Sequence, residues 1–229
     1  MSFTSYERYK QSGVEWLGAV PEHWSTLPLL AVGRERDERN TGMAESNLLS
    51  LSYGRIIRKD INTNEGLLPE SFETYQIVHP GDIIFRLTDL QNDKRSLRTA
   101  IVEERGIITS AYLALKPLSA NPQFLNYLFR AYDLRKVFYA MGGGVRQSMN
   151  YEDVKRMEML LPPMDEQFAI AGFLDLETTK IDALIQEQRR LIVLLKEKRQ
   201  AVISHTVTKG LNPCAPMKDP GIEWIGQLP

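Results

Sequence analysis

Two segments of the chain carry side chains suited to binding phosphates and base edges. The first follows a strand-like run and contains Arg86, Thr88, Gln91, Asn92, Lys94 and Arg95. The second follows three consecutive glycines and contains Arg146, Gln147 and Ser148. Arginine and lysine neutralise phosphates, amide and hydroxyl groups read base edges, and glycine permits close backbone approach. We predict these nine residues as nucleic-acid contacts, although a flexible connector explains the glycine segment equally well.

Motifs for catalysis or metal binding are weak. The one Pro-Pro pair, Pro162-Pro163, follows Leu161 and precedes Met164, whereas a DNA methyltransferase needs Asn or Asp before the pair and an aromatic residue after it. No Gly-x-x-x-x-Gly-Lys-Ser/Thr segment occurs, so an ATPase phosphate loop is not predicted. The three histidines lie far from one another in the sequence and far from the single cysteine. We therefore predict no catalytic residue, no metal site and no cofactor.

A metal-dependent nuclease is the enzymatic alternative. Such a site combines acidic residues with a lysine, and the residues that best match this pattern are Asp82 and Asp153-Val154-Lys155. A turn around Asp82 and a helix surface around Asp153 explain these residues adequately.

Composition places the chain among ordinary globular proteins. Of its 229 residues, 43% are hydrophobic and 25% are charged, and the net charge is −1. A nearly neutral chain gives no global signal for nucleic acid, so binding must depend on local clusters. The single cysteine excludes an internal disulfide, and neither a leader nor an apolar run of ~18 residues occurs. We expect a reduced, cytoplasmic protein without a membrane span.

The segments that must position the two loops are predicted to be rich in strands. Strand-like runs cover 47–53, 75–78 and 83–87, and His79-Pro80-Gly81-Asp82 predicts a turn. The β-branched content of 98–103 and 107–115 predicts a hairpin joined through 104–106. Between 26 and 40, an apolar stretch leading into Arg34, Arg36 and Arg39 predicts a strand followed by a helix with a solvated charged face.

Two helices and a strand follow these strands. Pro122 after Asn121 begins a predicted core helix that continues to Tyr139. A short helix at 150–156 and a strand at 157–161 lead the chain to its longest regular segment.

That segment, from Asp165 to Lys209, is predicted to be one long helix. Pro162 and Pro163 prevent a helix before it, and Gly210 can end it in the left-handed conformation. At 1.5 Å per residue it would be roughly 60 Å long. The predicted fold class is therefore α+β, with a strand-rich domain followed by one long helix of the coiled-coil type.

One face of the predicted long helix is apolar. Its proposed interface residues are Ile181, Leu184, Ile185, Gln188, Leu191, Ile192, Leu195 and Val202. Most of them, with Lys198, alternate in steps of three and four, which is a heptad seam with polar interruptions. The seam favours a partner helix, while an amphipathic helix lying on its own domain remains the alternative.

A repeated element defines a larger organisation. Residues 9–21 recur as residues 217–229, with Lys, Gly, Glu, Trp, Gly and Pro matched at an offset of 208. Both copies have the form Gly-Val/Ile-Glu-Trp-Leu/Ile-Gly-x-Val/Leu-Pro. Such repetition predicts a unit of about 200 residues that begins near Tyr9 and begins again near Met217. We expect the chain to represent one half of a two-unit protein.

The layout resembles the specificity subunits of type I restriction-modification systems. The resemblance includes the repeated Trp-containing element and the run Pro80 to Phe85. It continues through 142–147, Leu161-Pro162-Pro163-Met164-Asp165-Glu166-Gln167, Ile170-Ala171, 179–185, 195–203 and 208–211. It spans nearly the whole chain, and its combined spacing is more specific than any single motif.

The resemblance implies a non-catalytic subunit of a larger complex. Such subunits have two recognition domains, each reading half of a split DNA sequence, separated by two antiparallel spacer helices that dock methyltransferase subunits. These in turn recruit the restriction subunit. In this chain the resemblance divides residues into a lead-in (1–24), a target recognition domain (25–160), a spacer helix (161–210) and a truncated second repeat (211–229). Base-reading residues share no family motif, so none is transferred.

Only one recognition domain and one helix are present in this chain. A second copy could supply the missing helix and give a twofold homodimer that reads an interrupted palindrome in double-stranded DNA. Besides the nuclease, the alternative function is a coiled-coil scaffold without DNA contact.

Overall fold

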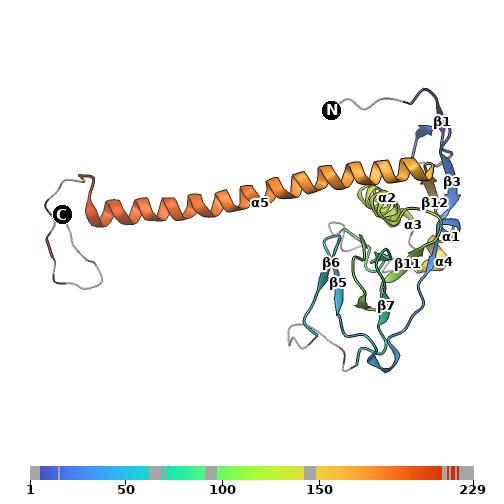
Figure 1. Ribbon diagram of the computed structural model, residues 1–229, viewed down its shortest axis with the longest axis horizontal. Helices are drawn as coiled ribbons and strands as arrows, with labels where there is room; N and C mark the ends of the chain where they lie inside the picture. Colours follow the sequence, from blue (N-terminus) through green and yellow to red (C-terminus); the bar gives the residue numbers. More distant parts are fainter. Residues whose placement is uncertain are drawn as a thin grey trace. The chain divides into compact units, whose positions relative to one another are not determined.

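The computed structural model describes residues 6–14, 16–61, 69, 71–90, 97–141, 148–212, 216, 218–219 and 221. The chain forms two compact units, Met1–Gly172 and Phe173–Pro229. The first consists of short antiparallel sheets and short helices, and a long helix follows them in the chain (Figure 1). This confirms the predicted α+β class. The functional boundaries after residues 24, 160 and 210 stay predictions.

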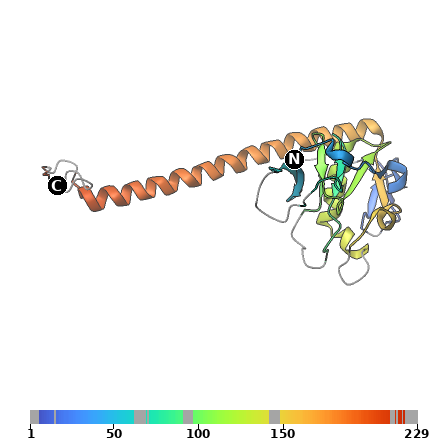
Figure 2. The same ribbon diagram turned by 90° about the horizontal axis from the view of Figure 1, so that it is seen from below.

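The strands of the first unit are short and belong to separate ladders (Figure 2). They are β1 (Tyr9–Gln11), β2 (Ala19–Pro21), β3 (Ser25–Pro28), β4 (Gly33–Glu35), β5 (Leu49–Ser52), β6 (Arg55–Arg58), β7 (Gln76–Val78), β8 (Ile83–Phe85), β9 (Thr99–Ile101), β10 (Gly106–Ile108), β11 (Leu113–Pro117) and β12 (Glu158–Leu161). The largest sheet has the antiparallel order β4-β11-β8-β9. The pairs β1-β2, β3-β12, β5-β6 and β7-β10 form two-stranded ladders.

The helices are α1 (Leu29–Val32), α2 (Pro122–Leu134), α3 (Val137–Met141), α4 (Tyr151–Val154) and α5 (Met164–Lys209), with a 3₁₀ turn at Thr41–Met43. None of the helices in the described part of the chain is long and apolar enough to cross a membrane.

The main core lies between α2 and the four-stranded sheet. Phe124, Leu125 and Phe129 of α2 are buried with Ile83 and Phe85 of β8. The rings of Phe85 and Phe129 meet edge to face, with centroids 4.6 Å apart. Burying such apolar surface is the dominant stabilising term in folding. This core supports the end of β8, from which the first predicted contact loop continues.

The predicted helix from Pro122 to Tyr139 is interrupted near its end and forms two helices. It begins as predicted, because the Asn121 side chain accepts a hydrogen bond from the Phe124 amide. It ends at Leu134, and Lys136 has a φ of 62° before α3 starts. A left-handed residue cannot continue a right-handed helix. The apolar periodicity runs across this break because α2 and α3 both face the core.

The predicted hairpin of 98–103 and 107–115 is also wrong. The first of these segments forms β9, which pairs with β8, and the second contains β10, which pairs with β7. Both segments are apolar and β-branched, but composition does not predict which strand each one pairs with. The pairing depends on which strands lie beside each other in the folded domain.

The charged segment after α1 is a strand and a structural ion-pair site instead of a helix. Gly33 follows α1 directly and begins β4, which pairs with β11. Arg36 continues in extended form, since its amide donates to the Ala114 carbonyl over 2.8 Å. The predicted solvated helical face is therefore wrong for this segment.

The long helix agrees closely with its predicted bounds. It begins at Met164, directly after the two prolines, and ends at Lys209. Gly210 has a φ of 69°, and its amide donates to the Thr206 carbonyl. Near the start, Gln167 is buried, donating to the Pro162 carbonyl and accepting from the Asn121 amide. The first turn of α5 is thus bonded to the start of α2 through Gln167.

Glu166 ties the same first turn to the N-terminal segment. Its carboxylate accepts hydrogen bonds from the Tyr6 hydroxyl (2.7 Å) and the Trp24 indole (3.0 Å), and it pairs with the His23 ring. Partial burial opposes ionisation, but these three contacts outweigh it and hold the pKa of Glu166 below its ordinary value. The ionised carboxylate therefore stabilises the lead-in against the helix.

We expect Glu166→Gln to reduce stability at neutral pH and to make stability less sensitive to acid. The folded pKa of Glu166 lies below its unfolded value, so its contribution is present above the unfolded pKa and is lost as pH falls through the folded pKa. Urea unfolding near neutral pH and in acid tests this: the difference from wild type should shrink in acid. Glu187→Gln, on an exposed turn of α5, is the control. A difference that does not change with pH would contradict the assignment.

Candidate nucleic-acid interface

The loop after β8 is fixed by two buried leucines. Leu87 and Leu90 are almost fully buried, whereas Arg86 before them and Thr88 and Asp89 between them are partly exposed. The Arg86 amide donates to the Arg98 carbonyl across the loop. The loop therefore turns apolar side chains inward and polar side chains outward.

Arg98 holds the backbone of this loop from beneath. Its side chain is fully buried, and its guanidinium donates to the carbonyls of Arg86 (3.1 Å), Thr88 (2.7 Å) and Asp89 (3.2 Å). It also donates to the Tyr139 hydroxyl of α3 over 3.0 Å. Hydrogen bonds to a charged group are stronger than those between neutral groups. A single cation thus fixes the backbone at two of the predicted contacts, Arg86 and Thr88.

An acidic side chain accompanies this buried cation. The Asp133 carboxylate of α2 accepts a hydrogen bond from the Arg98 amide over 2.7 Å. Burial raises the pKa of Asp133, although the Arg98 amide and neighbouring cations oppose that rise. The C-terminal end of α2 therefore helps to hold the backbone of Arg98, whose side chain supports the loop.

The structure brings the second predicted segment to the first. The Met149 amide donates to the Leu87 carbonyl over 2.9 Å, which places exposed Ser148 beside the loop after β8. Asn150 then begins α4, where its side chain and that of Asp153 form a reciprocal cap. Arg86, Thr88 and Ser148 therefore lie in one region although about sixty residues separate the two segments. The other predicted contacts, Gln91, Asn92, Lys94, Arg95, Arg146 and Gln147, lie outside the described residues.

Arg98 is the residue that sequence reasoning missed. It was predicted only as the first residue of a strand, and no motif marks it. The available signal is a single arginine at the start of the apolar run Thr99 to Val102. A charged side chain is rarely buried without partners, so an arginine in such an apolar run indicates nearby carbonyl or carboxylate acceptors.

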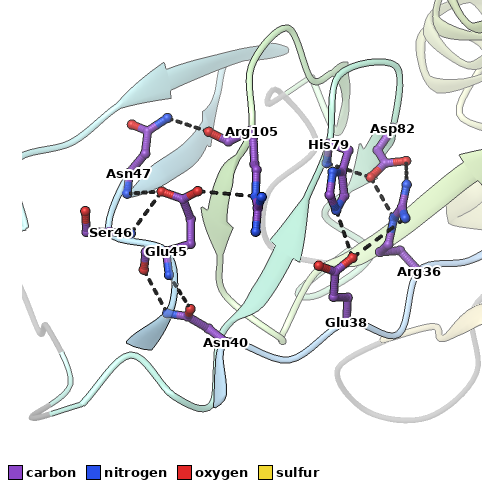
Figure 3. Close-up of polar contacts among 9 residues, drawn as sticks. All are labelled: Arg36, Glu38, Asn40, Glu45, Ser46, Asn47, His79, Asp82 and Arg105. Carbon is purple, nitrogen blue, oxygen red and sulfur yellow. Dashed lines mark hydrogen bonds and ion pairs between the residues drawn. The ribbon is translucent and has the colours of Figure 1, made fainter. Parts of the chain in front are cut away.

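The acidic residues of the nuclease alternative have structural partners. Asp82 is almost fully buried and receives two hydrogen bonds from Arg36, at 2.9 and 2.6 Å, and a third from the His79 amide (Figure 3). Asp153 caps α4. Buried carboxylates such as Asp82 are normally paired in this way, and the exposed Asp153 has a capping role, so neither needs a metal ion to explain it.

A second polar cluster holds the loop between Asn40 and Asn47. Asn40 and Glu45 exchange two hydrogen bonds, at 2.9 and 3.0 Å, and Glu45 also pairs with Arg105 at 3.3 Å (Figure 3). Hydrogen bonds from the Asn47 and Ser46 amides, with the charge of Arg105, outweigh burial and lower the pKa of Glu45. These contacts brace the segment that leads into β5.

The predicted interface residues of α5 lie in the second unit, and their side chains are exposed. Leu184, for example, is 60% exposed and Leu191 is 46% exposed. The remaining members, Ile181, Ile185, Gln188, Ile192, Leu195 and Val202, are exposed too. Val193 and Leu194, which the predicted seam did not include, are also about half exposed. The run Leu191 to Leu195 is therefore apolar on every side of the helix, a pattern typical of a helix covered by other chains or elements.

Comparisons with known proteins show what the chain is similar to in sequence and in fold. No family model matches the chain. A protein of Methanocaldococcus jannaschii that carries the name of the MjaX type I restriction enzyme specificity subunit is 24% identical over an alignment of 226 residues, and the match covers 92% of this chain and 51% of the relative. The chain thus spans about half the length of the relative it matches.

Two solved structures have a similar fold. A chain from a type I restriction-modification system has a TM-score of 0.58 and 18% identity, and the match covers 89% of this chain and 49% of that one. The HsdS subunit from Thermoanaerobacter tengcongensis has a TM-score of 0.52 and 17% identity, with 89% and 48% covered. At these identities the two likenesses show a shared fold. By sequence, the chain is similar to about half of a protein that carries the name of a type I restriction enzyme specificity subunit, and by fold it is similar to about half of each of the two solved chains.

Proposed function

We propose that this chain is a non-catalytic DNA-recognition subunit of a type I restriction-modification complex in the cytoplasm. Its first unit would read one half of a bipartite target in double-stranded DNA. The observation that carries this proposal is the meeting of the loop after β8 with the segment at Ser148, joined by the Met149–Leu87 hydrogen bond and supported by Arg98. A rigid frame that carries polar side chains outward is what base reading requires.

The long helix is proposed to bind two kinds of partner. One face of α5 would pair with the helix of a second copy, giving a homodimer that reads an interrupted palindrome. Another face would dock the methyltransferase subunit, through which the restriction subunit joins the complex. The run Leu191 to Leu195, apolar on all sides and exposed, supports more than one covering partner.

Co-expression with a type I methyltransferase subunit tests the proposal. Methylated adenines would then be mapped across the host DNA. Methylation at an interrupted palindrome is the expected result. A complex that forms but methylates no site would mean that one recognition domain per assembly is insufficient.

A scaffold without DNA contact remains the second candidate, favoured by the exposed apolar helix alone. The two candidates differ in their response to salt. A recognition subunit neutralises phosphates, so its DNA affinity should fall steeply as salt increases. A scaffold would have no salt-sensitive affinity to lose.

Arg146→Ala and Lys94→Ala should each weaken DNA binding. A lost phosphate contact weakens binding to all duplexes, whereas a lost base contact costs about 1–3 kcal/mol and relaxes sequence preference. Arg146→Ala should have the larger effect if its guanidinium reaches a base. Titration of labelled duplexes at several salt concentrations separates these effects.

The controls for this pair are Lys196→Ala and Arg199→Ala, which remove equal charge from exposed positions on α5. They should leave DNA affinity unchanged. If Arg146→Ala and Lys94→Ala also leave it unchanged, the two loops do not belong to the DNA site.

A further inference from the structure

The hairpin of β5 and β6 ends in a strained turn. Ser52 pairs with Arg55, so Tyr53 and Gly54 alone connect the two strands. Their φ angles are 46° and 76°, both in the left-handed region. Two-residue turns of this kind favour asparagine followed by glycine, and a bulky side chain at positive φ is unfavourable. A tyrosine at this position therefore works against the stability of the turn.

The same turn is held firmly from behind. The Arg130 guanidinium of α2 donates through one nitrogen to the carbonyls of Gly54 (2.7 Å) and Thr99 (2.9 Å). A Cβ on Gly54 would lie 2.4 Å from the Arg130 guanidinium, so a larger residue would displace the guanidinium from these carbonyls. The hairpin tip is therefore rigid.

Tyr53 gains no packing from this position, since its side chain is 79% exposed. Strained residues that contribute little to the core are found mainly at binding sites, where the side chain contacts a ligand or partner. Its aromatic ring is presented to solvent on a rigid support. Such a residue loses little further freedom on binding.

The hairpin tip lies at the same end of the domain as the candidate loops. Arg130 bonds the tip to Thr99, and the adjacent residue, Arg98, holds the loop after β8. The chain of contacts from Gly54 through Arg130, Thr99 and Arg98 to Thr88 thus links the hairpin to the predicted interface.

The outer face of the hairpin has the chemistry of a groove reader. Leu49, Leu51 and Ile56 face the core. The alternate positions, which face outward, are Ser50, Ser52, Arg55 and Ile57. They combine hydroxyls, one cation and an apolar group. The major groove of DNA is about 12 Å wide and admits a two-stranded ribbon of this kind.

We propose that the hairpin of β5 and β6 enters a groove of duplex DNA and that Tyr53 is a specificity-determining contact at its tip. The inference deepens the proposed function and rests on it. Ring contact with base edges, with Arg55 beside it, would add a second reading element to the loops at Arg86 and Ser148.

The test uses the full chain together with its methyltransferase subunit and a pool of randomised duplexes. Wild type, Tyr53→Asn and Tyr53→Phe would each select bound duplexes, and the affinity for the selected sequence would be measured. Asparagine suits the left-handed turn, so Tyr53→Asn should keep or raise the melting temperature. It should nevertheless weaken binding to the wild-type sequence about tenfold, within the usual range for a base contact. Tyr53→Phe should keep most of the affinity.

Tyr9→Thr is the control, because Tyr9 is also an exposed tyrosine, but it lies on β1 of the lead-in hairpin and not at the tip of the β5-β6 hairpin. It should bind DNA as wild type does. If Tyr53→Asn selects the same sequence with unchanged affinity while wild type binds specifically, the hairpin is not part of the site and the proposed function stands. If wild type selects no sequence, the proposed function fails and the inference fails with it.

Discussion

Replacing Arg98 by methionine should lower the free energy of unfolding by about 3–5 kcal/mol, because it removes a buried cation with several charge-assisted hydrogen bonds. Three loop carbonyls and the Tyr139 hydroxyl would lose their donor. Methionine fills a similar volume, so the loss is chiefly polar. Urea unfolding of the full chain measures this change.

The same substitution should also reduce DNA affinity at temperatures where the variant is folded. The loop after β8 would no longer be held on its frame, and ordering it on binding would reduce the net affinity. Arg98→Lys should recover only part of both losses, since a lysine keeps the charge but lacks the planar fork that reaches several carbonyls.

Arg58→Met is the control for the buried arginine. Arg58 is an exposed arginine that pairs with Glu104, and exposed pairs contribute little to stability. Its replacement should leave the unfolding transition almost unchanged. If Arg98→Met unfolds at the same urea concentration as wild type, Arg98 does not hold the loop.

The double substitution Leu184→Gln and Leu191→Gln should dissociate the proposed homodimer or release the methyltransferase subunit. Each leucine buried at an interface contributes about 1.5–3 kcal/mol. A homodimer loses two leucines from each copy, four in all, so the dissociation constant should rise at least about 10,000-fold. Glutamine favours helices, so α5 itself should persist. Sedimentation measures the homodimer, and co-purification measures the methyltransferase complex.

The control for this variant is Arg189→Gln together with Lys196→Gln, at exposed polar positions of the same helix. It should leave both associations intact, and circular dichroism should report the same helix content for both variants. If the leucine variant retains both associations, the seam assignment is wrong.

Features that depend on neighbouring residues were predicted well. The prolines before Met164 and the glycine after Lys209 gave the bounds of α5 to within one residue. The turn before Ile83, the start of α2 after Asn121 and the short α4 were also predicted correctly. Each is determined within a few residues, by a fixed φ, a missing amide or a capping side chain.

Features that depend on residues distant in the sequence were not predicted correctly. The segments 98–103 and 107–115, predicted to form one hairpin, instead contain β9 and the start of β11, both of the four-stranded sheet, and most of β10, which pairs with β7, because apolar strands of similar composition differ only in the partners that fold beside them. The charged segment after Gly33 became a strand since β11 was there to pair with it. The strained tip at Tyr53 was invisible in the sequence, because only the positive φ and the Arg130 contacts distinguish it.

By itself, the sequence determined the long helix, its apolar stripe, the strand-rich region before it and the side-chain types that suit DNA. These follow from local backbone preferences and from the spacing of apolar residues. Only the tertiary structure decided that Ser148 lies beside the loop after β8 and that Arg98 supports that loop. The reason is physical: the Met149–Leu87 bond joins residues about sixty positions apart, and the Arg98 bonds depend on burial that folding alone creates.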